Sequence, residues 1–330
     1  MDLVTFGEAM LRLTPPGWHR LEDARSFDVY PGGSELNVAV GAARLGLQTR
    51  WVSRLPENPL GRTVANRARE LGVDVSCVAW SPNDRLGLYF VELAEGAGAR
   101  ASDIVYDRTG SAMARITPGT VDWKHALHGA SWFHVSGITA ALSDTAAATL
   151  AESLAAAKAA SLTVSYDLNF RPKLWSAEQA RRAQEPLMRH VDVLIASEDA
   201  AGAVFGVAGD GAESVARELQ KRLRVPVVVV TSREGSATRS TSWRATVVAE
   251  GRAHDSASRQ VEVREPIGAG DAFAAGLIYG RLKHGSWDAA VRYGAALVTL
   301  KYQMPGDFSQ ATLGDVERVL ADSAPRMVNR

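Results

Sequence analysis

Short apolar runs alternate along the chain with longer segments of helical periodicity. The runs that predict buried strands lie at 3–8, 48–52, 76–80, 132–137, 162–167, 192–195 and 226–231. The segments that predict helices lie at about 34–45, 60–71, 143–160, 178–189, 198–205, 211–223, 269–284, 287–301 and 313–321. Antiparallel strands are expected at 243–249 and 259–263. Because strands and helices alternate, the pattern indicates a mostly parallel sheet covered by helices.

The region from 86 to 107 breaks this alternation. Two β runs, at 86–93 and 104–106, follow each other with no helix between them, which predicts a hairpin-like insert. With the pieces near 11–14 and 27–30 they are expected to form a small second sheet, a flap at the edge of the main body. We therefore expect one domain over 1–330, with lid segments at about 11–31 and 86–108.

The bulk composition narrows the class of protein. The chain has 330 residues and is 46% hydrophobic, so it can build a sizeable core. Its formal net charge is zero, which argues against a general nucleic-acid or membrane-surface role. Cys77 is the only cysteine, which excludes an intrachain disulfide and suits a reducing cytoplasm. We expect no signal peptide and no transmembrane helix, since no uncharged apolar run approaches ~18 residues.

The clearest candidate for chemistry is the start of the helix at 269–284. Gly268, Ala269 and Gly270 lead into this helix, and a helix start offers unpaired N–H groups that attract anions. Asp271 in its first turn is placed to take a proton from a hydroxyl beside a bound phosphate. An ordinary helix start with a first-turn acid is the more common meaning of such a motif taken alone. Within the helix, Gly276 and Gly280 predict close packing against a neighbour.

A second glycine pair, Gly32 and Gly33, opens the helix at 34–45. Asn37 lies one turn inside this helix and could offer both a donor and an acceptor to a substrate hydroxyl. A simple helix N-cap with a surface asparagine explains the motif about equally well.

Two further segments carry polar groups that suit a ligand. Tyr106 and Arg108, two apart on a strand, share a face and could meet a carboxylate or hydroxyls, or form an exposed rim. Asp167, Asn169 and Arg171 follow a buried strand and are expected to alternate on one face at the carboxyl end of the sheet, where ligands of α/β proteins bind. The guanidinium of Arg171 suits a carboxylate or a phosphate.

The segment after the strand at 192–195 offers two acids, Glu198 and Asp199. They could hold magnesium through water, although a favourable first-turn charge is the slightly preferred explanation. Other motifs are missing from the sequence: it has no P-loop, and Phe273 stands where a dinucleotide fingerprint needs its last glycine.

Together these motifs resemble a known family. Residues 32–39 and 268–273 resemble the two motifs of the ribokinase-like (PfkB) carbohydrate kinases, and the resemblance covers essentially the whole chain. It implies an α/β fold, a ribokinase-like three-layer αβα sandwich with a mostly parallel central sheet and a small β-sheet lid. Within the family, residues 106–112 and 167–175 are most similar to 2-keto-3-deoxygluconate kinases.

The resemblance implies phosphoryl transfer from ATP, with Mg²⁺, to the primary hydroxyl of a sugar acid. 2-Keto-3-deoxygluconate, converted to its 6-phosphate, is the expected substrate, and the C4 stereochemistry that distinguishes gluconate from galactonate derivatives stays open. Asp271 would be the general base, and the N–H groups of Gly268, Ala269 and Gly270 would form the anion hole. The lid would close over the sugar and exclude water. Lids of the family often pair between subunits, which implies a homo-oligomer, and a K⁺ requirement is left open.

The expected site residues fall into three groups. The substrate contacts are Gly33, Asn37, Tyr89, Tyr106, Arg108, Arg171 and Asp307. The nucleotide contacts are Asn169, Ser197, Thr231, Gly235, Gly268 and Gly270. The magnesium candidates are Glu198 and Asp199. Ser197 and Ala200 stand where the family commonly has the Asn and the Glu of Asn-x-x-Glu, and this departure leaves the metal ligands in question.

Two other functions fit the same fold. One is a neutral-sugar kinase of the fructokinase or ribokinase type, and the other is a non-catalytic sugar-binding protein. Arg108 and Arg171 favour the sugar acid, because two cations directed at one substrate require an anion.

Overall fold

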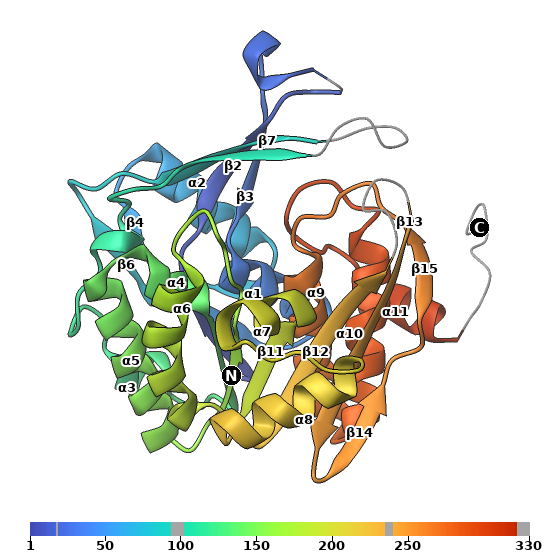
Figure 1. Cartoon of the computed structure of the whole chain (residues 1–330). Coiled ribbons are helices and arrows are strands. Elements are labelled where there is room, and N and C mark those ends of the chain that lie inside the picture. The colour runs from blue at the N-terminus through green and yellow to red at the C-terminus, as the bar shows by residue number, and fades with distance from the viewer. Residues whose placement is uncertain (18, 94–101, 235–239, 322–330) are drawn as a thin grey trace.

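One large sheet forms the centre of the computed structural model, which describes residues 1–17, 19–93, 102–234 and 240–321 (Figure 1). Its strand order is β14-β13-β12-β11-β10-β9-β1-β4-β5, with β6 beside β4 and β15 beside β13. The strands are β1 (Leu3–Phe6), β4 (Thr49–Pro56), β5 (Val73–Asp74), β6 (Val78–Ser81), β9 (Trp132–Ser136), β10 (Thr163–Asp167), β11 (Val193–Ser197), β12 (Val227–Glu234), β13 (Ser240–Ala249), β14 (Arg252–Asp255) and β15 (Arg259–Glu262). The run from β12 to β5 is parallel, whereas β13, β14 and β15 pair antiparallel. The predicted mostly parallel sheet is confirmed.

Helices cover both faces of this sheet, and the two largest apolar clusters of the described residues lie between these helices and the sheet. The helices are α1 (Ser34–Arg44), α2 (Pro59–Glu70), α3 (Trp123–Ala126), α4 (Gly137–Leu142), α5 (Asp144–Ala159), α6 (Ala177–Gln184), α7 (Glu198–Phe205), α8 (Ala212–Leu223), α9 (Ala269–His284), α10 (Trp287–Lys301) and α11 (Leu313–Leu320). One cluster packs residues of α3, α5, α7 and α8 against the sheet, and the other packs residues of α1, α9, α10 and α11. The result is the expected three-layer sandwich.

A separate four-strand sheet lies above one end of the main body, as Figure 1 shows. Its strands are β2 (Met10–Thr14), β3 (Asp28–Gly32), β7 (Gly87–Glu92) and β8 (Asp103–Asp107), in the order β3-β2-β7-β8. The β7–β8 pair is antiparallel, which confirms the hairpin-like insert. This sheet is the predicted lid.

The two faces of the lid differ in chemistry. The strand register places one polar and aromatic row across the sheet, composed of Tyr30, Arg12, Tyr89 and Tyr106. The neighbouring row, composed of Val29, Leu13, Phe90 and Val105, points to the opposite face because side chains alternate along a strand. In the first row Arg12 and Tyr89 are buried, whereas in the second row Val29 and Val105 are about half exposed. The inner face of the lid is therefore the polar and aromatic one.

The close packing predicted from two glycines is also confirmed. A Cβ atom on Gly276 would lie 2.6 Å from the carbonyl oxygen of Tyr293, and one on Gly280 would lie 2.7 Å from the Cα atom of Ala290. These positions let α9 and α10 approach until their backbones touch. The middle of α9 is thereby packed directly against α10.

Several element boundaries differ from the prediction. The helix expected at 143–160 is preceded by a short helix, α4, and the one expected at 178–189 ends at Gln184 in a 3-10 turn that contains Pro186. Proline has no N–H to continue an α-helix, which explains this change. The strand expected at 76–80 is shifted to β6, and β14 is not visible in the apolar pattern. None of the helices in the described ranges is long and apolar enough to span a membrane.

Candidate active site

The start of α9 is open to a ligand. Gly268 is its N-cap residue, and no side chain caps the helix there. The φ of Gly268 is 79°, and a Cβ atom at this position would lie 2.1 Å from the carbonyl oxygen of Asp307, so only glycine fits. A Cβ atom on Gly270 would meet nothing within 4 Å. Among the described residues, the N–H groups of Ala269, Gly270 and Asp271 have no hydrogen-bond partner, so they are available to an anion.

Asp271 is held by both of its carboxylate oxygens. The hydroxyl of Ser34 donates to Oδ1 at 2.7 Å, and Nδ2 of Asn37 donates to Oδ2 at 2.7 Å. Nδ2 of Asn169 in turn donates to the hydroxyl of Ser34 at 2.9 Å. The first turns of α1 and α9 are thus joined at the one carboxylate that the sequence singles out. Ser34 was missed as a site residue, although its place directly after the glycine pair was a signal.

Asn37 links the start of its own helix to the candidate base. Its Oδ1 accepts from the N–H of Gly33 at 3.2 Å while its Nδ2 holds Asp271, and the residue is only 4% exposed. It is therefore not a surface asparagine, and both ends of its amide already have protein partners. A direct contact of Asn37 with substrate stays a prediction.

The segment that follows β10 brings two carboxyl groups close to one cation. Burial raises the pKa of Asp271, whereas hydrogen bonds from Asn37 and Ser34 and the charge of Arg171 lower it. Burial and the charge of Asp271 raise the pKa of Asp167 to about 7, and Arg171 acts in the opposite direction. Arg171 is exposed, and in the described part of the chain its guanidinium has no hydrogen bond or ion pair. It is a free cation beside the candidate base.

The expected alternation of Asp167, Asn169 and Arg171 along an extended strand is wrong. β10 ends at Asp167, Asn169 has a φ of 39°, and its N–H donates to Oδ1 of Asp167 at 2.9 Å. The backbone therefore turns here, because the Asp167 side chain bonds the main chain two residues later. This turn, and not a strand face, determines where Arg171 lies.

The second predicted arginine, Arg108, is already paired. Its Nε donates to Oε2 of Glu8 at 2.8 Å, its Nη2 binds the same oxygen, and the residue is 8% exposed. Its guanidinium also lies over the ring of Tyr106, 5.6 Å from the centroid. The charge of Arg108 is thus offset inside the protein. Glu8 was missed because nothing local shows that it faces a residue 100 positions away.

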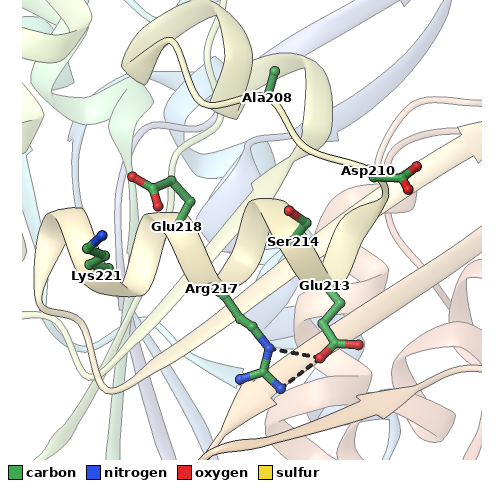
Figure 2. A pocket seen from close by; sticks show the side chains of 7 residues that line it. All are labelled: Ala208, Asp210, Glu213, Ser214, Arg217, Glu218 and Lys221. Atoms are coloured by element: carbon green, nitrogen blue, oxygen red, sulfur yellow. Dashed lines mark hydrogen bonds and ion pairs between the residues drawn. The ribbon is translucent and has the colours of Figure 1, made fainter.

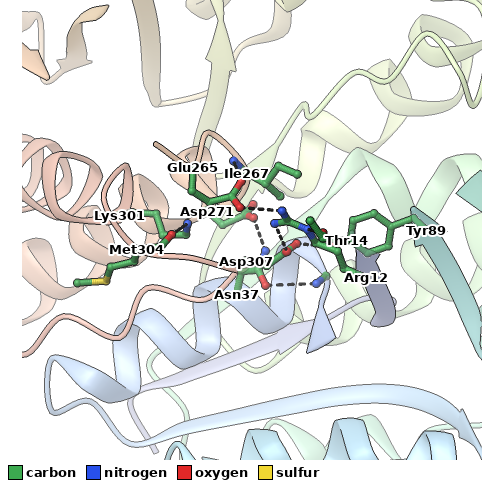
Figure 3. Close-up of polar contacts among 11 residues, drawn as sticks. Arg12, Thr14, Asn37, Tyr89, Glu265, Ile267, Asp271, Lys301, Met304 and Asp307 are labelled. Atoms are coloured by element: carbon green, nitrogen blue, oxygen red, sulfur yellow. Dashed lines mark hydrogen bonds and ion pairs between the residues drawn. The ribbon is translucent and has the colours of Figure 1, made fainter. Parts of the chain in front are cut away.

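Tyr89 and Asp307 contact each other at the inner face of the lid. The hydroxyl of Tyr89 donates to Oδ2 of Asp307, and Nη1 of Arg12 donates to Oδ1 at 3.3 Å. A Cβ atom on Gly32 would lie 2.4 Å from Oδ2, so glycine is required for this approach. Figure 3 shows these side chains beside Asp271. Arg12 carried no signal in the sequence, since it belongs to no motif.

Two of the predicted nucleotide residues, Ser197 and Thr231, lie side by side on adjacent strands. Ser197 and Thr231 are register partners on β11 and β12, and the Ser197 hydroxyl caps α7 by accepting from the N–H of Ala200 at 3.1 Å. Glu198 and Asp199 lie in the first turn of α7. Gly235 lies outside the described residues. Within the described ranges, no group of three or more His, Cys, Asp or Glu side chains could hold a metal ion by itself.

Figure 2 shows a surface hollow that contains none of the predicted residues. Its lining is Ala208, Asp210, Glu213, Ser214, Arg217, Glu218 and Lys221. In this lining, Nη2 of Arg217 and Oε1 of Glu213, one turn apart on α8, form an ion pair at 2.7 Å. This hollow is a charged surface of α8 and takes no part in the candidate site.

Comparison with known proteins gives the family. A model of the pfkB family carbohydrate kinases matches residues 1–310. The chain belongs to the PfkB family of carbohydrate kinases. It is therefore an ATP-dependent phosphotransferase. The resemblance seen in the two glycine motifs is confirmed.

Relatives of this PfkB kinase act on sugar acids. A 2-dehydro-3-deoxygalactonokinase of Haloferax volcanii is 39% identical over 321 residues, which are 97% of this chain and 96% of that protein. A 2-dehydro-3-deoxygluconokinase of Thermoproteus tenax is 30% identical over 276 residues, 83% of this chain and 80% of that protein. The crystal structure of a 2-dehydro-3-deoxygluconokinase from Thermotoga maritima matches with a TM-score of 0.92 at 38% identity, over 97% of this chain and 99% of that one. The ribokinase-like fold is thereby confirmed.

Proposed function

We propose that this PfkB kinase phosphorylates the primary hydroxyl of a 2-keto-3-deoxy sugar acid, with 2-keto-3-deoxygluconate converted to its 6-phosphate. The observation that carries the proposal is Arg171, an exposed cation with no ion pair in the described structure, whose charge acts on the candidate base Asp271. A substrate carboxylate could form a direct ion pair with this cation, which a neutral sugar cannot. The relatives from Haloferax and Thermotoga are named for the two C4 epimers, so both acids belong in the test.

The chemistry follows from the arrangement around α9. Ser34 and Asn37 hold the Asp271 carboxylate, whose free lone pairs accept the proton of the sugar hydroxyl as its oxygen attacks phosphorus. A raised pKa brings this base closer to neutral pH and makes it a stronger acceptor. The N–H groups of Gly268, Ala269 and Gly270 stabilise the charge that develops on the transferred group.

The remaining contacts to the substrate are assigned by position. Arg171 pairs with the carboxylate, since Arg108 is already offset by Glu8 and contributes only its remaining N–H groups. Gly33, Asn37, Tyr89, Tyr106 and Asp307 complete the proposed substrate set. The lone pairs of Asp307 that Tyr89 and Arg12 leave free are available to a sugar hydroxyl.

The residues proposed to bind ATP and magnesium include those near the ends of β10, β11 and β12. Asn169, Ser197, Thr231 and Gly235 are proposed to border ATP, together with Gly268 and Gly270. The donor set fits magnesium, which is held in such sites by one or two carboxylates, water and phosphate oxygens, and Glu198 and Asp199 would supply those carboxylates. When bound, the ion neutralises phosphate charge. Initial rates with and without K⁺ would determine whether that ion is required.

A homo-oligomer is the proposed assembly. The outer lid row of Val29, Leu13, Phe90 and Val105 is apolar, and two of its members are about half exposed. A second copy of the lid would remove this surface from water. Sedimentation of the purified protein measures the assembly directly.

The substrate assignment is tested by coupled assays of ATP consumption with both keto-deoxy acids, fructose and ribose. We expect the acids to be the best substrates of the wild type. Arg171→Ala should lower kcat/KM for the acid by about 10- to 100-fold, the value of one charged hydrogen bond, and leave slow turnover of fructose unchanged. Arg182→Ala is the matched control, since Arg182 is an exposed arginine of α6 paired with Glu178. A wild type that prefers fructose or ribose would overturn the assignment in favour of the neutral-sugar kinase.

A further inference from the structure

A buried charge cluster lies between the lid and the anion hole (Figure 3). At its centre is Arg12 of β2, which is 0% exposed. Its Nη2 donates to Oε2 of Glu265 at 2.7 Å, its Nη1 to Oδ1 of Asp307 at 3.3 Å, and its Nε to the hydroxyl of Thr14 at 2.7 Å. One guanidinium thus bridges two acids that come from different loops.

Both of these acids contact the anion hole. Oε1 of Glu265 accepts from the N–H of Ile267 at 3.2 Å, and Ile267 directly precedes Gly268. The carbonyl oxygen of Asp307 lies so close to Gly268 that a Cβ atom there would be 2.1 Å away. Both partners of Arg12 therefore contact the loop that begins α9.

The other side of the cluster belongs to the lid. Arg12 is the register partner of Tyr30 on β3 and of Tyr89 on β7, and its guanidinium lies 5.5 Å from the centroid of the Tyr30 ring. The hydroxyl of Tyr89 donates to Asp307. The inner face of the lid therefore reaches the anion-hole loop through two side chains on adjacent strands.

The cluster is balanced in charge by a second buried cation. Nζ of Lys301 donates to the carbonyl oxygen of Met304 at 3.0 Å, and Lys301 is 0% exposed. The charges of Glu265 and Asp307 both act on it, while burial lowers the pKa of Lys301 to about 8. Below that pH, Arg12 and Lys301 together offset the two carboxylates.

We propose that Arg12 is a positioning residue for phosphoryl transfer, which couples the seating of the lid to the shape of the anion hole through Glu265 and Asp307. With the lid seated, Glu265 and Asp307 are held in place beside the loop, and the N–H groups of α9 point at the transferred group. Without this link the loop and the lid move independently, and water enters the site. The inference rests on the kinase activity of the family and not on the identity of the sugar.

A purely structural role of Arg12 is the competing explanation. The energetics of buried ion pairs allow a variant that loses the proposed positioning role but keeps its stability. Replacing such a pair by uncharged residues of similar volume is often neutral for stability, whereas removing one partner leaves an unpaired charge. The variant Arg12→Met/Glu265→Gln removes one positive and one negative charge, and leaves Lys301 opposite Asp307. We expect it to melt near the wild-type temperature.

The test measures four quantities: kcat, KM for ATP, melting temperature, and the ratio of ATP consumed to sugar phosphorylated. The assays use the best substrate of the wild type, at a pH below the pKa of Lys301. In the double variant kcat should fall about 10- to 100-fold, as expected for displaced catalytic groups, with little change in KM for ATP. The consumption ratio should rise, because an unseated lid admits water. Arg12→Lys should be intermediate, since a compact ammonium keeps the charge but lacks the two separate nitrogens with which the guanidinium reaches the two acids.

Arg85→Met is the matched control. Arg85 also lies beside the lid, but its partner Asp107, at 2.6 Å, belongs to the lid itself. The Arg85→Met enzyme should therefore keep the wild-type kcat and the wild-type ratio of ATP consumed to sugar phosphorylated. A folded double variant with wild-type kcat and ratio would overturn the proposal, as would an equal loss in Arg85→Met. If the double variant does not fold, Arg12→Lys decides: a reduced kcat with a raised ratio supports the proposal, and wild-type values refute it.

Discussion

The starts of α9 and α10 differ although the two helices pack against each other and each carries an acid in its first turn. α10 is capped in the ordinary way: the hydroxyl of Ser286 accepts from the N–H of Ala289 at 3.5 Å, and Asp288 points to solvent beside His254. α9 has no side-chain cap, and Asp271 is held by Ser34 and Asn37 of another helix. An acid at a helix start is therefore not a catalytic feature by itself. What distinguishes α9 is that its N–H groups are left open while its carboxylate is fixed.

The largest difference between the two helix starts is expected in kcat, when the first-turn carboxylate of each helix is replaced in turn. Asp271→Asn should lower kcat by about 10²- to 10⁴-fold, because the base that accepts the hydroxyl proton is lost while the size of the side chain is kept. Asp288→Asn should leave kcat unchanged. Steady-state assays of both variants check this, and near-wild-type turnover by Asp271→Asn would refute the role of the base. Turnover by the wild type that depends on Asp271 also excludes the non-catalytic sugar-binding protein.

A second, smaller difference in kcat is expected between substitutions of the two glycines with positive φ that flank α9, Gly268 and Gly285. Gly268→Ala should lower kcat by about 100-fold, because the new Cβ must displace the Asp307 carbonyl and with it the anion-hole loop. Gly285, with a φ of 64°, has nothing within 4 Å of an added Cβ. Gly285→Ala should therefore cost about 1 kcal/mol of stability and leave kcat intact. Equal kcat values for the two variants would contradict this account.

The smallest effect is expected at the cap of α10. Ser286→Ala should lower the free energy of unfolding by about 1 kcal/mol, because the N–H of Ala289 loses its partner. It should not change kcat, since this helix start faces no ligand in the account given above. Urea unfolding measures the first quantity and a coupled assay the second. A clear fall in kcat would show that the starts of α9 and α10 are not functionally distinct.

Features that depend on local sequence were predicted well. The lid followed from the lack of a helix between two β runs, and the close contact of α9 with α10 followed from Gly276 and Gly280. Asp271 was found because glycines before a helix and an acid within it form a compact motif. These features could be predicted because they depend on residues that are close in the sequence, through hydrophobic periodicity and the residue preferences of turns.

The partners of these residues could not be found in that way. Arg12 and Glu265 are 253 positions apart, and Arg108 and Glu8 are 100 apart, so no local pattern connects them. The turn at Asn169 was missed because the hydrogen bond from its N–H to Asp167 overrides the strand alternation. Which polar side chains pair with each other is decided by the tertiary fold, and this determined that Arg171 and not Arg108 is the free cation.

The most direct test is a crystal structure of the complex with a non-hydrolysable ATP analogue, magnesium and the keto-deoxy acid that the enzyme phosphorylates best. The account predicts that the γ-phosphate lies on the N–H groups of Gly268, Ala269 and Gly270. The primary hydroxyl of the sugar should then lie about 2.6–3.2 Å from the Asp271 carboxylate, with the acid group beside Arg171. A γ-phosphate bound away from the start of α9, or a hydroxyl out of reach of Asp271, would contradict it.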